Sequence, residues 1–299
     1  MGHGHSHAPD RSANKKALKL TLILTTTFTV AEVIGGLITG SLALLADAGH
    51  MFTDVGALAL SMVAMRLAQR PPSPEKTYGY VRLEILAALV NGATLLVMSG
   101  FIVREAWERF QAPRQVDGPV MLTVAVVGLG VNLVGAFLLH SHSHHNLNLR
   151  GAYLHVLGDL LGSVGAIAAA VTILLTGWMP ADPLISVFIA LLILVSAWRL
   201  VKEATDVLME AAPEHIDVEE VRRALEKIPG LHDVHDLHVW TLTSGFVALS
   251  GHGVVEDLEE QGRILEEITS RMEERGIRHV TFQLEPRPLY TIPGMEEGP

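Results

Sequence analysis

Two segments of the chain repeat one pattern of metal-binding side chains. The pattern is His-x-x-x-Asp, and it occurs at His50 and Asp54 and again at His155 and Asp159. Residues four apart lie on one face of a helix, about 6 Å apart, so each pair offers an imidazole nitrogen and a carboxylate oxygen to a common point. Two such helices packed together supply two nitrogens and two oxygens, which suits tetrahedral zinc. We predict a zinc site built from these four residues.

The surroundings of these residues are apolar, which makes their presence unfavourable without a ligand. A charged side chain at the centre of a bilayer costs about 2.5–3.5 kcal/mol on insertion scales, and neither stretch contains a Lys or Arg to pair with the aspartates. A lone polar residue of this kind is usually a hydrogen-bonded packing residue, but the recurrence of the His-Asp pair on two helices favours a metal site.

Asp47, one turn before His50, is a supporting carboxylate, a proton carrier or a helix-start residue, and we favour a supporting role. Interhelical hydrogen bonding explains Asn91 and Asn132, while Glu32 stays open.

The two pairs lie within two of six apolar stretches, each long enough for a spanning helix of about 20 residues. Of the 299 residues, 49% are hydrophobic and 18% are charged, whereas soluble proteins carry about 25% charged residues. We predict an all-α bundle of six transmembrane helices over 17–208, preceded by a histidine-containing cytoplasmic tail at 1–16. The stretches run over 17–39, 42–65, 83–103, 120–139, 152–176 and 183–201.

The following segment, 209–290, has the pattern of a small cytoplasmic α+β domain. Helical spacing of apolar residues marks two amphipathic helices, and alternation marks three strands. The order α-β-β-α-β predicts a three-stranded sheet with both helices on one face, and 291–299 is a loose tail. The helices are expected at 214–228 and 257–276, and the strands at 235–240, 246–255 and 280–284.

Charge sets the orientation and excludes several classes of function. Basic residues before the first stretch and in the second loop, with none in the first and fifth loops, place both termini in the cytoplasm of a multi-pass protein of the cell (inner) membrane. Three arginines after the third stretch point the other way. The net charge of −10 argues against a nucleic-acid partner, and the absence of cysteine excludes thiolate ligands. No His-Glu-x-x-His motif occurs, so we expect no enzyme activity.

Four motifs in order resemble the cation diffusion facilitator family of zinc transporters. They are the run from Gly40 to Asp54, the triplet Tyr78-Gly79-Tyr80, the stretch from His155 to Asp159, and the stretch from His235 to Trp240. The resemblance implies a homodimer that expels Zn²⁺, and in some members Cd²⁺, Co²⁺ or Fe²⁺, in exchange for protons. It also assigns the transport site to the four residues of the repeated pattern. Two His and two Asp accompany a preference for zinc in this family.

The resemblance further implies a metal site in the cytoplasmic domain. Relatives bind zinc there through a His early in the first strand, a His in the second and an acid at the end of the third. By this resemblance the ligands are His235, His252 and Glu285, with His238 and His279 as the next choices, while Gln283 stands where some relatives place a His. Strand alternation puts His235 and His238 on opposite faces, so one ion would not easily reach both.

Other histidines support two readings each. The loop histidines gather cytosolic metal or belong to a polar loop, and the N-terminal histidines have the same alternatives, with a cloning artefact as a third. These are His140, His142, His144 and His145 in the loop, and His3, His5 and His7 at the N-terminus. The function that we expect is proton-coupled efflux of Zn²⁺, with Cd²⁺ or other divalent ions as further cargo; zinc would also be a regulatory ligand. The alternative is a membrane sensor that binds zinc without transporting it.

Overall fold

The computed structural model describes residues 11–68, 70–143, 147–243 and 245–286. The expectations for the N-terminal histidines, for His144 and His145 and for the tail 291–299 therefore lie outside the described residues. The chain forms two compact units, one of residues 1–61 with 90–201 and the other of residues 62–89 with 202–299. Each unit is described by itself.

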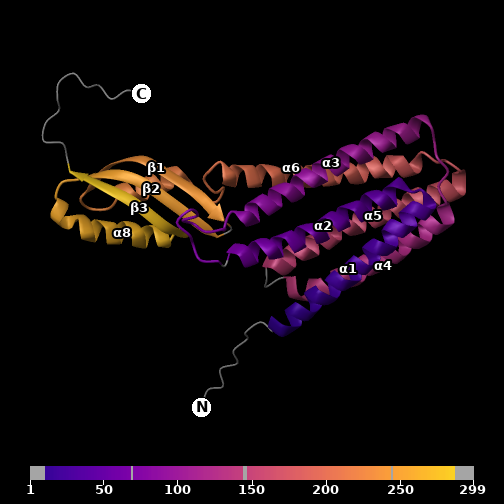
Figure 1. Ribbon diagram of the computed structural model, residues 1–299, viewed down its shortest axis with the longest axis horizontal. Helices are drawn as coiled ribbons and strands as arrows, with labels where there is room; N and C mark the ends of the chain where they lie inside the picture. Colours follow the sequence, from indigo (N-terminus) through magenta and orange to yellow (C-terminus); the bar gives the residue numbers. More distant parts are fainter. Residues whose placement is uncertain (1–10, 69, 144–146, 244, 287–299) are drawn as a thin grey trace, which may run out of the picture. The chain divides into compact units, whose positions relative to one another are not determined.

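Six long helices occur where the six apolar stretches predict them, and each extends beyond its predicted bounds at one or both ends (Figure 1). Within the described residues, four of them are long and apolar enough to cross a membrane, and residues 23–39 form a shorter apolar segment. The predicted helical membrane region is confirmed. The helices are α1 (Arg11–Thr39), α2 (Leu42–Ala68), α3 (Leu83–Gln111), α4 (Gly118–Ser143), α5 (Leu147–Thr176) and α6 (Ala181–Leu208).

The first unit has small side chains inside and large apolar side chains outside. Alanines dominate its core, and they allow close approach of helix backbones, as is usual between membrane helices. In contrast, Phe137 and Leu175 are 81% and 80% exposed. This arrangement suits a bundle that is surrounded by hydrocarbon. The buried alanines include Ala43, Ala46, Ala106, Ala166, Ala169, Ala170, Ala190 and Ala197.

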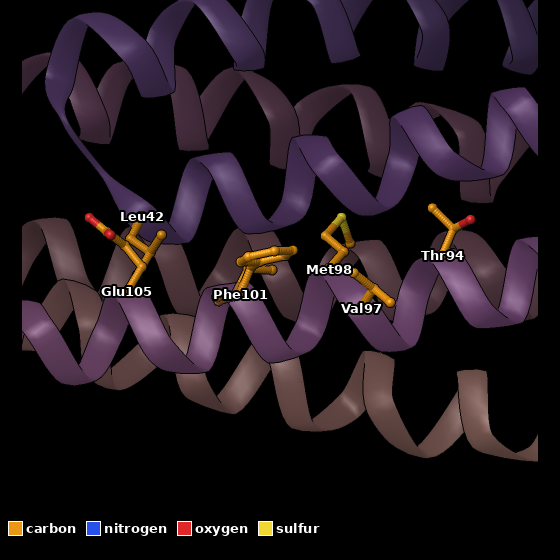
Figure 2. A pocket seen from close by; sticks show the side chains of 7 residues that line it. Leu42, Thr94, Val97, Met98, Phe101 and Glu105 are labelled. Carbon is orange, nitrogen blue, oxygen red and sulfur yellow. The ribbon is translucent and has the colours of Figure 1, made fainter.

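An apolar groove of about 350 Å³ runs along this unit between the start of α2 and one face of α3. Figure 2 shows Leu42 beside Glu105 at one end and Thr94 at the other, with Met98 and Phe101 between them. The groove is lined mainly by apolar side chains, with Glu105 as its one carboxylate, and neither histidine nor aspartate contributes to it. It is therefore unsuited to a metal ion and suited to contact with apolar groups.

The start of α2 is capped by a residue 140 positions away in the sequence. The fully buried carboxylate of Asp182, at the start of α6, accepts hydrogen bonds from the Ser41 hydroxyl (2.5 Å) and from the backbone N–H groups of Leu42 (2.8 Å) and Ala43 (3.1 Å). Arg109 of α3 lies 3.6 Å from the same carboxylate and donates to the Gly40 carbonyl. A negative charge here satisfies N–H groups that a helix leaves unpaired. Asp182 therefore holds the starts of α2 and α6 together.

The second unit contains the predicted α-β-β-α-β domain. Its elements are α7 (Val218–Glu226), β1 (Leu231–Thr243), β2 (Phe246–Val255), a short 3₁₀ turn (Leu258–Glu260), α8 (Gln261–Glu273) and β3 (Ile277–Pro286). The sheet order is β1-β2-β3, with β1 antiparallel and β3 parallel to β2 (Figure 1). The apolar sides of both helices share one core with the strands. Helix α7 begins at Val218 because the Asp217 side chain accepts a hydrogen bond from the Glu219 N–H (2.9 Å).

Two irregularities in β1 change which side chains share a face. Asp233 and Asp236 have φ angles of 45° and 47°, and the pairing with β2 shifts register at both points. Each bulge inserts one residue. As a result, His232, His235 and His238 pair with Val254, His252 and Ser250 respectively, which alternate along one face of β2. The prediction that His235 and His238 lie on opposite faces is wrong, because strict alternation fails at the bulges.

Candidate metal sites

The first candidate site lies in the helical unit. On α2 the Nε2 atom of His50 is 3.5 Å from Oδ2 of Asp54, as the spacing of four predicts. On α5, Asp159 is 2% exposed. The side chain of His155 is outside the described set, although its backbone lies in α5. The four-residue transport site therefore stays a prediction.

Asp47 lies in the same helix and is in contact with two others. Its carboxyl group lies near that of Glu32 of α1, and both side chains are buried. On the α5 side, a Cβ atom placed on Gly162 would lie 2.8 Å from Oδ1 of Asp47. Asp47 thus bridges α1 and α5 rather than starting α2, since Asp182 fills the helix-start role.

The predicted role of Asn132 is confirmed. This buried residue of α4 donates from Nδ2 to the Ser163 hydroxyl of α5 at 3.3 Å. Such interhelical hydrogen bonds are typical of polar residues in membrane bundles. The contact also lies one residue from Gly162, so it fixes α5 close to the acidic pair.

The second candidate site lies on the exposed face of the sheet. Ligand atoms of His235, His252 and Glu285 all lie within 4.8 Å of one another. The distance is 3.7 Å from His235 Nε2 to Glu285 Oε2 and 3.1 Å from His252 Nδ1 to Glu285 Oε1. The structure thus brings together the three residues that the family resemblance named, one from each strand.

Neighbouring groups orient these three side chains. The His235 Nδ1 atom lies 2.8 Å from the Asp233 carbonyl oxygen, which directs Nε2 toward Glu285. The Gln283 amide donates to Glu285 Oε1 at 2.9 Å. Hydrogen bonds of this kind set the tautomer and direction of metal ligands. Gln283 therefore orients the Glu285 carboxylate by a hydrogen bond and stands at a position where the family resemblance suggested a further His ligand.

Of the two secondary candidate ligands, His238 lies near the cluster and His279 does not. His238 lies beside the cluster, where its Nε2 is 2.9 Å from Oδ1 of Asp236. His279 does not join it: it pairs with Ala248 at the start of β3, six residues and therefore about 20 Å from Glu285. Its ring instead contacts Tyr78 and Phe246, with centroids 6.0 Å and 6.2 Å away.

Asp236 is a polar residue at this face that the sequence patterns did not predict as part of the site. His238 holds the pKa of its carboxyl group below the usual value, through a hydrogen bond and then through charge, with smaller charge effects from His252 and His235. A signal for it exists in the sequence, where the triplet His-Asp-apolar repeats from His232 to Leu237. The repeat of three is the period that the two bulges produce.

Comparison with known proteins agrees with this architecture. Residues 18–209 match the cation efflux transmembrane domain, and residues 213–287 match the cytoplasmic domain of cation efflux proteins. The chain is 47% identical over 290 residues to the cadmium, cobalt and zinc/H(+)-K(+) antiporter of Bacillus subtilis (strain 168), covering 95% of this chain and 92% of that protein. The chain belongs to the cation efflux family, the cation diffusion facilitators, which are transporters and not enzymes.

Further relatives have related names. The zinc transporter ZitB of Escherichia coli (strain K12) is 44% identical over 296 residues, covering 97% of this chain and 94% of that protein. The metal cation efflux system protein CzcD of Cupriavidus metallidurans is 43% identical over 291 residues, covering 96% and 92%. A solved structure, the metal-bound C-terminal domain of the CzcD transporter, is 36% identical and covers 23% of this chain and 99% of that one, with a TM-score of 0.22.

Proposed function

We propose that this protein exports Zn²⁺ from the cytoplasm in exchange for protons, with Cd²⁺ and Co²⁺ as further cargo. The ion would be held by His50, Asp54, His155 and Asp159. The observation that carries the proposal is the His50–Asp54 pair on α2, together with a buried aspartate on α5, in a bundle whose exterior is hydrocarbon-like. The names of the relatives, which include zinc transporters and a zinc/H(+)-K(+) antiporter, support the same cargo.

The exchange follows from the chemistry of the ligands. Zinc requires neutral imidazole and ionised carboxylate, so metal binding releases protons and protonation releases metal. A site that loads zinc from the cytoplasm and then opens to the outside would lose the ion to competing protons. The protonated site would return with its charge neutralised, which eases its passage through an apolar bundle. This cycle uses no ATP.

The setting of the protein belongs to the same proposal. The membrane part would span 17–208 of a multi-pass protein in the cell (inner) membrane, with both termini in the cytoplasm. The cytoplasmic domain, 209–290, would bind zinc through His235, His252 and Glu285 in a homodimer. Zinc there would be a regulatory ligand that biases the membrane helices, since two sites coupled in this way influence each other reciprocally.

Zinc uptake into inverted membrane vesicles separates a transporter from a sensor. An acidic vesicle interior should drive zinc inward without ATP, and collapse of the pH gradient by an ionophore should stop it. The same vesicles with and without K⁺ distinguish exchange for protons from exchange for potassium. Zinc binding with no uptake under any gradient would support the sensor and refute the exporter.

Substitution of Gly162 by alanine is predicted to lower zinc uptake by about tenfold or more. The new Cβ atom would lie 2.8 Å from the Asp47 carboxylate and force α5 away from it. Gly158→Ala is the matched control, because a Cβ atom at that position meets none of the described atoms within 4 Å. Initial rates in vesicles with equal protein content provide the measurement. Equal rates in the two variants would contradict a role for close packing between α5 and Asp47.

A further inference from the structure

Helices α3 and α6 approach each other near both of their ends and line a groove together (Figure 1). Near one end, Nη1 of Arg109 lies 3.6 Å from the Asp182 carboxylate. Near the other end, a Cβ atom placed on Gly92 would lie 2.7 Å from a methyl carbon of Val201. The groove has a volume of about 640 Å³, within the range of about 300–1,000 Å³ that is usual for ligand pockets. It is lined by Gly100, Val103, Arg104, Trp107, Phe110 and Val187.

One part of the groove is apolar and open. A Cβ atom placed on Gly100 would meet none of the described atoms within 4 Å, so this glycine leaves space beside the backbone of α3. Val103 of α3 and Val187 of α6 add apolar walls. A narrow apolar space of this kind on a membrane helix bundle fits a hydrocarbon chain.

A cation and an anion stand together at the end of the groove that lies toward the C-terminus of α3. The Nε atom of Arg104 is 3.0 Å from Oε1 of Glu108, and the two side chains are 74% and 48% exposed. This contact uses the Nε–H group, and a guanidinium has further N–H groups that can donate to a second anion. The pair therefore offers donors to a phosphate and, beside them, an acceptor for an ammonium group.

The position of this pair along α3 matches the edge of a bilayer. Helix α3 has 29 residues and is therefore about 43 Å long, close to the thickness of a bilayer with its headgroups, about 40–45 Å. Centred in a bilayer, it would place Trp107 about 15 Å from the midplane, where the hydrocarbon ends, and Arg104 about 5 Å deeper. Tryptophan is enriched at this boundary, and a long basic side chain extends from this depth to the headgroups.

We propose that the groove between α3 and α6 binds a zwitterionic phospholipid whose headgroup carries a primary amine. Its phosphate would accept from Arg104, its ammonium would donate to Glu108, and one acyl chain would lie beside Gly100. The charge pair selects this headgroup. An anionic glycerol headgroup brings a second negative charge to Glu108 with no ammonium to offset it, and a choline headgroup has no N–H to donate. The proposal does not depend on which ion the protein transports.

Native mass spectrometry of the full-length protein tests this site. The protein in detergent is equilibrated with equal amounts of phosphatidylethanolamine, phosphatidylcholine and phosphatidylglycerol that have the same acyl chains. We expect about tenfold more retained phosphatidylethanolamine than either other lipid. Arg104→Gln should lower its retention about tenfold, and Glu108→Gln should lower it to the level of phosphatidylcholine. The matched control is Arg114→Gln, because Arg114 is 61% exposed and pairs with Glu105 outside this groove.

Gly100→Leu tests the acyl chain separately, since the new side chain would occupy the open space and should lower retention of all three lipids. Equal retention of the three lipids by the unaltered protein would overturn the proposal, as would full retention in both Arg104→Gln and Glu108→Gln. A preference for phosphatidylglycerol, or an equal loss in Arg114→Gln, would replace it with unspecific attraction to positive charge. Loss of the dimer in Gly100→Leu with unchanged lipid content would assign the groove to a second copy of the chain.

Discussion

Replacement of both Asp54 and Asp159 by asparagine is expected to reduce zinc uptake at least about 100-fold. Each aspartate contributes a charge-assisted contact to the ion, worth about 1.5–3 kcal/mol, so the loss of two weakens binding by at least about 3 kcal/mol. Asparagine has nearly the same volume as aspartate, which preserves packing around Asp159, a side chain that is 2% exposed. The measurement is the initial rate of uptake into inverted vesicles under a fixed pH gradient.

The control for this prediction is Asp206→Asn. Asp206 is half exposed near the end of α6, where its carboxylate is 4.0 Å from the Lys202 ammonium, and such a surface pair contributes little. Its variant should transport at the original rate. Undiminished uptake by the Asp54→Asn, Asp159→Asn double variant would refute the proposed transport site. The single variants should each show an intermediate loss, since each retains one of the two carboxylates.

Substitution of Asp182 by alanine is expected to destabilise the helical unit by about 3–5 kcal/mol. The change leaves the Ser41 hydroxyl and the N–H groups of Leu42 and Ala43 without their acceptor, and it removes one of two carboxylates near Arg109, which is 7% exposed and keeps Glu105 at 3.1 Å. For a unit of this size, such a loss lowers the melting temperature by about 10 °C. Thermal unfolding in detergent, followed by circular dichroism, provides the measurement.

A double variant shows whether the weaker compensation of Arg109 causes part of this loss. Arg109→Met in the Asp182→Ala background removes a buried charge that has kept only its contact with Glu105 at 3.1 Å among the described carboxylates, so part of the stability should return. Asp206→Ala serves as the exposed control and should unfold within about 1 °C of the original protein. An unchanged melting temperature in Asp182→Ala would contradict the view that this carboxylate holds α2 to α6.

The helices and the domain order were predictable because hydrophobic patterning is a local signal. Six apolar stretches gave α1 to α6, and the alternation of Phe246 to Val255 gave β2 within its observed bounds. The His50–Asp54 contact also follows from helical spacing alone. These features depend only on neighbours within one or two turns of the chain.

The features that were not predictable depend on local backbone exceptions or on distant partners. The bulges in β1 require non-glycine residues at positive φ, and alternation gives no warning of them. They place His238 on the same face as His235 and make Asp236 a neighbour of His252. Asp182 caps a helix 140 residues earlier, and Glu32 meets Asp47 across two helices. Such pairings arise only when the elements pack.

The location of zinc in the membrane domain tests the central claim most directly. Crystals of the full-length protein grown with zinc, measured on both sides of the zinc absorption edge, would place the ion by anomalous scattering. We predict a peak between α2 and α5, about 2.0–2.2 Å from nitrogens of His50 and His155 and oxygens of Asp54 and Asp159. A membrane-domain peak on Glu32 and Asp47 instead, or helices that turn the four side chains apart, would contradict it.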